Sequence, residues 1–264
     1  MEFRTQVDIP SPPFQIEPCE RMLFVGSCFA DEMGRRFAEE KFRTTVNPFG
    51  VMYNPASILH TVERLDEAFE TVVLTLGTNH VYILKESGEI VDNCAKRPQQ
   101  LFEERELSID ECADYLQKAI YVLRRHNPQV NIVLTVSPIR YRKYGYHGSQ
   151  LSKATLLLAV EKVGENYFPA YEILNDELRD YRFCKPDMLH PSDQAVEYIY
   201  ERFAETYFSC ATKDFLKEWA PLKVALQHRP FDAESEAYQE FCSKIKLRLE
   251  ALSKKYSDLA IDNL

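Results

Sequence analysis

Two short segments of the sequence carry groups that could perform chemistry on a carbonyl. A hydroxyl and a thiol stand side by side at Ser27 and Cys28, directly after the apolar run 23–25 and a glycine. An aspartate precedes a histidine by three positions, at Asp187 and His190. This spacing lets the carboxylate hydrogen-bond the imidazole Nδ1, which fixes the tautomer and leaves Nε2 free as a base. Such a base could activate a hydroxyl or thiol nucleophile.

The cysteines do not form a metal site or a disulfide framework by their spacing. There are seven, an odd number, and no C-x-x-C pair occurs among them. We therefore expect reduced thiols in a cytoplasmic protein. No clustered set of histidine and aspartate ligands is apparent either, so we predict no metal and no cofactor.

Length and charge exclude several classes of protein. The 264 residues are 45% hydrophobic, which is enough for one sizeable core, and the net charge is −9. No block rich in lysine and arginine exists, which argues against nucleic-acid binding. No run approaches 18 apolar residues, so we predict no membrane span, and the first residues lack the apolar region of a signal peptide.

Apolar runs alternate with segments of helical periodicity about five times. Strands are predicted at 21–26, 44–46, 71–76, 131–136 and, less regularly, 169–174, with a hairpin at 81–91. Helices are predicted at 31–42, from 55, at 108–125, 151–163 and 192–208. This rhythm predicts parallel strands with right-handed helical crossovers, in a three-layer αβα sandwich. The polar loops at Ser27, Gly50, Asn79 and Ser137 all follow strands and should share one edge of the sheet.

The chain divides by composition into three parts. Residues 1–20 are rich in proline and are predicted to form an extended arm, and residues 21–210 the α/β domain. Residues 211–264 show no strand signal, and apolar residues recur there at helical spacing. We interpret them as a helical extension packed on the domain, with a dimerisation helix as the alternative. The oligomeric state is left open.

The order of these features resembles that of the SGNH (GDSL-type) esterase superfamily. A serine follows the first strand, a glycine the second and G-x-N the third, and D-x-x-H closes the domain. The string G-S-C-F-A at 26–30 is similar to the signature of the GSCFA domain family, which belongs to that superfamily. Further matching segments are NPFGVMYNP, TLGTNHVY, TVSPIR, SKATLLLA, YFPAYEILNDELRDYRF and DMLHPS. The resemblance runs from about Gly26 to Phe203 and implies a flavodoxin-like or SGNH sheet of about five strands.

The resemblance implies a role for each matching residue. Ser27 would be the nucleophile, His190 the general base and Asp187 the group that orients it. The oxyanion hole would consist of the Ser27 and Gly50 amides and the Asn79 side chain. The implied activity is that of a serine esterase or acyltransferase, working through an acyl-enzyme on an O-acyl ester of a carbohydrate or cell-envelope precursor.

The sequence departs from the superfamily pattern at two blocks. The first block is G-S-C where G-D-S is usual, so Cys28 stands in the register of the usual serine. The family pattern favours Ser27 as nucleophile, with Cys28 as the alternative or as a neighbour of the substrate. The third block is G-T-N-H, in which His80 is either a substrate contact or a structural residue. Both departures motivate a second hypothesis, a non-catalytic binding module that retains the fold.

Other polar residues are expected at the same edge. Asn47, Ser137 and Arg140 are possible substrate contacts. Arg140 could meet a carboxylate or phosphate of the substrate, or it could pair with an acid of the protein. Asp180 is an alternative orienter of His190, but the sequence favours a structural ion pair of Asp180 with Arg179 or Arg182. For Gly50 the alternative is a tight turn that needs a positive φ.

Overall fold

A parallel sheet of five strands forms the centre of the protein. The computed structural model describes residues 4–92, 94, 97–231 and 234–259. The strands lie in the order β2-β1-β3-β7-β8, and every neighbouring pair is parallel. Their bounds are Arg43–Val46 for β2, Arg21–Gly26 for β1, Thr71–Leu76 for β3, Asn131–Val136 for β7 and Asn166–Tyr167 for β8. The predicted parallel α/β fold is thus confirmed.

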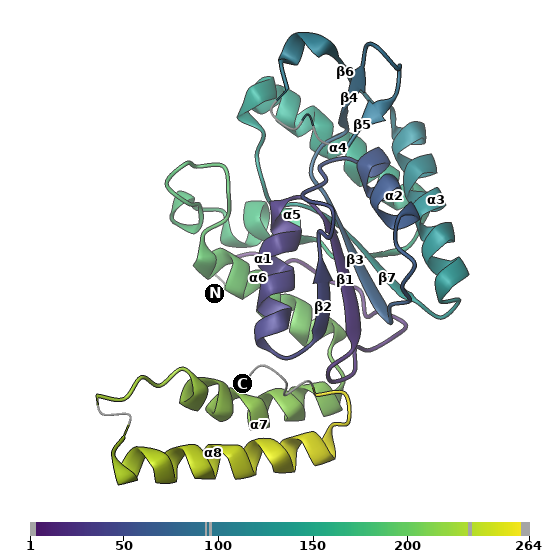
Figure 1. Ribbon diagram of the computed structural model, residues 1–264. Helices are drawn as coiled ribbons and strands as arrows, with labels where there is room; N and C mark the ends of the chain where they lie inside the picture. The colour runs from purple at the N-terminus through teal and green to yellow at the C-terminus, as the bar shows by residue number, and fades with distance from the viewer. Residues whose placement is uncertain (1–3, 93, 95–96, 232–233, 260–264) are drawn as a thin grey trace.

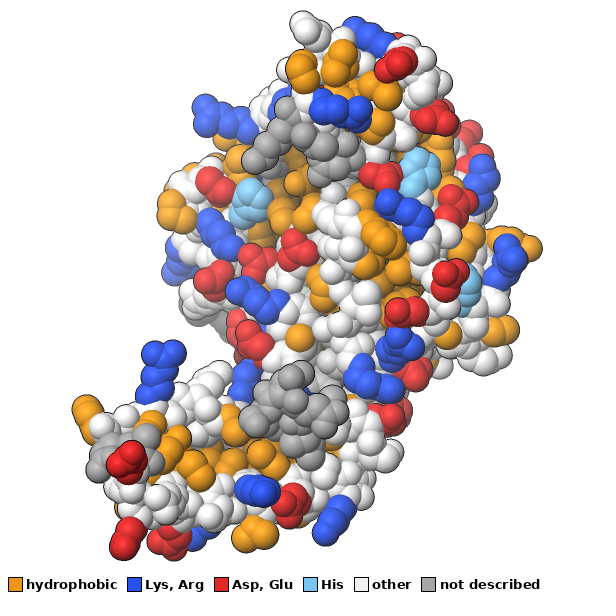
Figure 2. All heavy atoms as spheres, viewed as in Figure 1, with side chains coloured by type: hydrophobic (Ala, Val, Ile, Leu, Met, Phe, Trp, Pro, Cys, Tyr) orange, Lys and Arg blue, Asp and Glu red, His pale blue; other side chains and the backbone are white. Residues whose placement is uncertain are grey.

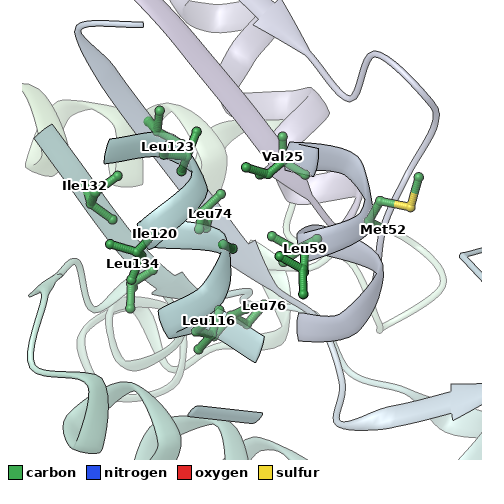
Figure 3. Close-up of a cluster of buried hydrophobic side chains, with 14 of the residues drawn as sticks. Val25, Met52, Leu59, Leu74, Leu76, Leu116, Ile120, Leu123, Ile132 and Leu134 are labelled. Carbon is green, nitrogen blue, oxygen red and sulfur yellow. The ribbon is translucent and has the colours of Figure 1, made fainter. Parts of the chain in front are cut away.

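Helices cover both faces of this sheet (Figure 1). Leu23 and Val25 of β1 belong to the core under α2, α3 and α4, whereas Met22 and Phe24 belong to the core under α1 and α6. The alternation follows from the two-residue period of a strand. Figure 3 shows part of the first core, where side chains of α2 and α3 pack on β3 and β7. The helices are α1 Cys28–Glu39, α2 Pro55–Glu63, α3 Ile109–His126, α4 Gly145–Val163 and α6 Asp193–Tyr207.

The strand predicted at 169–174 is wrong. The fifth strand is β8, and it pairs only with Val133 and Leu134 of β7. The Phe168 amide donates the last bond to this ladder, and the Ile173 amide already donates to the Pro169 carbonyl. The chain after Pro169 is therefore helical, as α5 Ala170–Glu172 and the π-helix η3 Ile173–Leu178. Its apolar residues pack as a helix rather than extending the sheet.

A small antiparallel sheet stands apart from the main one. Strand β4 His80–Leu84 pairs with β5 Ile90–Val91, which confirms the predicted hairpin, and with β6 Phe102–Glu106. The charged sequence of β6, FEERE, gave no strand signal. Short 3-10 helices lie at Gln99–Leu101 (η1), Arg142–Tyr144 (η2) and Tyr181–Phe183 (η4).

The C-terminal part consists of two helices, α7 Cys210–Leu226 and α8 Glu236–Lys255. Phe215, Trp219 and Leu222 of α7 share a core with the apolar face of α8, and Figure 2 shows apolar side chains between the two helices. The Trp219 indole donates to the Glu39 carbonyl at 3.0 Å, which attaches α7 to the end of α1. No helix among the described residues has both the length and the apolar character needed to cross a bilayer.

Candidate active site

The corner between β1 and α1 can be built only with glycine at its first position. Gly26 has φ +142°, and a Cβ at this position would lie 2.0 Å from the Thr75 carbonyl oxygen. Asn47 holds this corner, because its Oδ1 accepts from the Gly26 amide at 2.9 Å and its Nδ2 donates to Asp31 at 2.6 Å. Asn47, predicted as a possible substrate contact, therefore has both ends of its side chain bound within the protein.

Ser27 occupies the position of a buried helix cap. Its Oγ accepts from the Phe29 amide and lies 2.6 Å from the Ser137 Oγ and 3.3 Å from the Thr75 Oγ1. The Ser27 amide is also bound, to the Thr75 carbonyl and hydroxyl. Both Ser27 and Ser137 have no exposed surface. Between the described residues no hydrogen bond joins Ser27 to His190, so the catalytic role of Ser27 stays a prediction.

Cys28 is the first residue of α1 and is partly exposed. Its thiol lies close enough to Tyr53, Tyr141 and Lys153 to interact with them electrostatically. Burial raises the pKa of Cys28, the negative charge of Asp31 adds to this increase, and positive charge nearby acts in the opposite direction. The resting thiol is therefore protonated, and it needs a base before it can act as a nucleophile.

His190 and Asp187 form the pair that their spacing predicts. The Asp187 Oδ2 lies 2.6 Å from the His190 Nδ1. The Asp187 Oδ1 accepts from the Leu189 amide at 2.8 Å and the His190 amide at 3.1 Å. These bonds, the Leu189 amide first, lower the pKa of Asp187 to about 2. An ionised Asp187 favours the tautomer that carries a proton on Nδ1, which leaves the His190 Nε2 as a base.

The loop that carries His190 is attached to the first turns of α1. The Lys185 amide donates to the His190 carbonyl at 2.8 Å. The Lys185 Nζ donates to Glu32 at 2.8 Å, and Glu32 lies four residues after Cys28 on α1. Lys185 also acts to lower the pKa of the Cys28 thiol. The imidazole loop and the thiol therefore belong to one loop cluster at the carboxyl edge of the sheet.

Two further donors predicted for the oxyanion hole are already bound to protein acceptors. The Gly50 amide donates to the Asn47 carbonyl at 2.8 Å, in a turn where Gly50 has φ +96°. The Asn79 Nδ2 donates to the Leu107 carbonyl at 2.8 Å, and the buried Asn79 Oδ1 has no hydrogen-bond partner in the described part of the chain. The Asn79 side-chain amide has a second hydrogen that is not used in this bond, but the hydrogen bond to the Leu107 carbonyl points the amide group toward Leu107. These geometries fit a turn and a loop anchor.

His80 begins β4 and packs against an aromatic ring. Its imidazole stacks on Tyr144, with ring centres 3.6 Å apart and planes 3° from parallel. Burial lowers the pKa of His80, although the carboxylates of Glu106 and Glu104 act to raise it. The sequence leaves His80 as either a substrate contact or a structural residue, and the stacked, neutral ring fits the structural role.

Sequence reasoning missed a buried phenol and a buried amine that interact electrostatically with Cys28. The Tyr141 hydroxyl is buried and has no hydrogen-bond partner among the residues that the structure describes. It occupies the space a side chain at Gly77 would need, since a Cβ there would lie 2.3 Å away. The Lys153 Nζ donates to the Gly77 carbonyl at 2.7 Å and the Ser137 carbonyl at 2.8 Å.

Lys153 is unusual because it is fully buried and no carboxylate among the described residues lies within 4 Å of it. Burial lowers the pKa of Lys153 to about 7. Its place on the buried face of α4, with Ser149, Leu156 and Val160 at helical spacing, was a signal available in the sequence. Across the parts of the chain that the structure describes, no three His, Cys, Asp or Glu side chains gather as a metal site would require.

Comparison with known proteins identifies the sequence pattern. The model of the GSCFA family matches residues 21–71 and 64–203, and the model of the GSCFA domain protein C-terminal domain matches residues 219–263. No protein of curated function matches significantly.

Several solved structures share the general arrangement at low similarity. A lipolytic protein of the G-D-S-L family from Veillonella parvula is 11% identical, with a TM-score of 0.45, covering 71% of this chain and 97% of that one. A variant of an acetyl xylan esterase from Geobacillus stearothermophilus is 14% identical, with a TM-score of 0.43, covering 74% and 98%. A carbohydrate esterase of family 3 from Talaromyces cellulolyticus is 8% identical, with a TM-score of 0.42, covering 75% and 99%.

Proposed function

The chain belongs to the GSCFA family, and we propose that it is an SGNH-type esterase or acyltransferase that cleaves O-acyl esters of a carbohydrate or cell-envelope precursor. The observation that carries the proposal is the attachment of the Asp187–His190 pair to the helix that begins with Cys28. This attachment supports a site in which the oriented imidazole of His190 serves the thiol at the start of the same helix, as acyl transfer requires.

Cys28 is the better-placed nucleophile of the two candidates. Ser27 is sealed from solvent, and its hydroxyl is needed to cap α1 and to bond Ser137. A thiol also loses its proton more readily than an alcohol, because its ordinary pKa is about 8.5. The first amides of α1 place positive potential at the thiol, which favours a thiolate as the proton leaves. We therefore assign the nucleophile to Cys28 and the cap to Ser27.

The reaction then proceeds in two acyl transfers. The Cys28 sulfur attacks the ester carbonyl while its proton passes to the His190 Nε2, and a bond forms between sulfur and the acyl carbon. The imidazolium, stabilised by Asp187, gives that proton to the departing alcohol oxygen as the ester bond breaks. Water or a second alcohol, deprotonated by His190, attacks the thioester, and the sulfur leaves and takes the proton back.

The oxyanion of each tetrahedral intermediate needs donors that the protein does not already use. The Cys28 amide lies at the first position of α1, where no helical carbonyl can accept from it. The buried Tyr141 hydroxyl interacts electrostatically with Cys28 and has no hydrogen-bond partner among the described residues. Burial raises its pKa well above the ordinary value, so it remains a donor. We assign these two groups to the oxyanion hole in place of the bound Gly50 and Asn79 donors.

Hydrolysis of p-nitrophenyl acetate by four proteins tests the proposal. The wild type should turn over, Cys28→Ala and His190→Ala should lose at least about a hundredfold in kcat/KM, and Ser27→Ala should keep most activity if circular dichroism shows that it folds. If Cys28→Ala kept full activity and a folded Ser27→Ala lost its activity, Ser27 would be the nucleophile and the assignment to Cys28 would be wrong. No turnover of any activated ester by the wild type would favour the non-catalytic binding module.

A further inference from the structure

The loop after β7 contributes an arginine to the wall of two cavities, and no carboxylate among the described residues pairs with it. Arg140 lines two adjoining cavities, of about 250 Å³ and 650 Å³. Among the described residues no carboxylate lies within 4 Å of its guanidinium, which hydrogen-bonds to the Cys184 sulfur at 3.6 Å and to the Tyr181 side chain. Because guanidinium stays charged at any physiological pH, this cation is available to an external anion.

The acids near Arg140 are committed to other groups. Asp180 lines the smaller cavity, but its carboxylate accepts from the Arg182 amide at 2.8 Å and lies 3.9 Å from the Arg182 Nε. The Asp187 carboxylate is occupied by His190. A second arginine, Arg179, lines the same small cavity and is likewise free of a carboxylate within 4 Å in the described chain. In a protein of net charge −9, this wall is locally basic.

Two aromatic rings flank the guanidinium and remain open to solvent. The Arg140 Cζ lies 5.4 Å from the ring centre of Tyr181 and 5.8 Å from that of Tyr146. The two residues, Tyr181 and Tyr146, are 66% and 55% exposed. Exposed rings beside a cation offer an apolar surface for a sugar ring together with a fork of donors for its charged group.

The cavity adjoins the proposed reaction centre. The Arg140 amide donates to the Leu189 carbonyl at 3.1 Å, one residue before His190. Met188, between Asp187 and Leu189, lines the larger cavity. A substrate bound against Arg140 would thus contact the loop that holds the general base.

We propose that Arg140, with Tyr146 and Tyr181, forms a subsite for an anionic group on the substrate, so that the ester is carried by an acidic carbohydrate. The inference rests on the proposed esterase function and adds the substrate class. The anion is a carboxylate, as in a uronic acid, or a phosphate, as in a sugar phosphate, and both suit the guanidinium fork.

The test compares matched acetate esters of methyl glucoside, methyl glucuronide and glucose 6-phosphate. The wild type should favour at least one charged ester over the neutral one by about tenfold or more in kcat/KM. Arg140→Gln should abolish that preference. Arg142→Gln, an exposed arginine two residues away, is the control and should keep it. The preferred charged ester identifies the source of the anion.

Equal rates on charged and neutral esters by the wild type, or a preference that survives Arg140→Gln, would overturn the subsite while leaving the esterase proposal intact. If no ester is hydrolysed, p-nitrophenyl acetate included, the esterase proposal fails, and calorimetry then decides the subsite alone. Methyl glucuronide or glucose 6-phosphate should bind the wild type at least tenfold more tightly than Arg140→Gln. Equal or undetectable binding by both proteins would refute the subsite.

Discussion

Replacing Tyr141 with phenylalanine tests whether the hydroxyl of this residue serves the reaction or the fold. The substitution removes one oxygen atom and keeps the ring, which packs edge-on against Tyr53 with centres 6.0 Å apart and lies 5.4 Å from the Lys153 Nζ. If the hydroxyl served the fold, its loss would lower the free energy of unfolding. If it waits for an oxyanion, its loss should affect the reaction alone.

The expected change in stability follows from the missing hydrogen bond. A buried polar group without a partner costs about 1–3 kcal/mol in the folded state, because water bonds it in the unfolded chain. Tyr141 has such a hydroxyl. The free energy of unfolding of Tyr141→Phe, measured in urea, should therefore rise by about 1 kcal/mol, and it should not fall.

Whereas the stability of Tyr141→Phe should rise, its kcat should fall, and the loss in transition-state stabilisation should exceed the gain in the free energy of unfolding. Loss of one oxyanion donor typically lowers kcat by about 10²–10³. Because the oxyanion exists only near the transition state, KM for p-nitrophenyl acetate should change little. The signature of Tyr141→Phe is thus a slower enzyme that is at least as stable as the wild type.

Tyr200→Phe provides the matched control. The Tyr200 hydroxyl is also buried, and no described residue hydrogen-bonds to it, but it lies in the core between α1 and α6. Its removal should raise stability by a similar amount and leave kcat unchanged. Equal kcat values in Tyr141→Phe and Tyr200→Phe, or a clear loss of stability in Tyr141→Phe alone, would refute the assignment of Tyr141 to the oxyanion hole.

Three other substitutions test separate parts of the site. Ser27→Ala removes the cap of α1 and the bond to Ser137, so urea unfolding should show a loss of about 1–2 kcal/mol; unchanged stability would contradict the structural role. Asp187→Asn should lower kcat by about 10²–10⁴ because His190 loses its orienting carboxylate; kinetics equal to wild type would exclude the pair. Burial lowers the pKa of Lys153 to about 7 from its ordinary 10.5, so the unfolded chain binds a proton that the folded chain lacks between these values. Stability should therefore rise from pH 7 to pH 9 by about 1.4 kcal/mol per unit, and Lys153→Met should lack this slope in urea unfolding at matched pH values.

Local sequence patterns predicted most of the strands and loops that position the site. The buried runs of β1, β3 and β7 were readable from their residues, and parallel connectivity then required the loops after them to meet at one edge. The Asp187–His190 pair was predictable because both partners lie within one short loop. The strand expected at 169–174 failed because a short apolar run fits a buried helix as well as a strand.

The contacts that assign roles within the site are long-range and were beyond sequence reasoning. The burial of Ser27 depends on Ser137 and Thr75, which reach it from two other strand ends. The packing of α4 and of the loop after β7 over β3 determines the surroundings of the buried Tyr141 hydroxyl and of the Lys153 amine. Periodicity could place Lys153 on a buried face, but it could not show which groups the amine meets.

Mass spectrometry of the acyl-enzyme tests the central claim, that Cys28 is the nucleophile, most directly. The protein is mixed briefly with p-nitrophenyl acetate, quenched in acid, digested and sequenced. We expect one acetyl group on the peptide that contains Cys28, attached to sulfur and released by neutral hydroxylamine, and no adduct in Cys28→Ala. An acetyl group on Ser27, or an unmodified peptide while hydrolysis proceeds at the full rate, would contradict it.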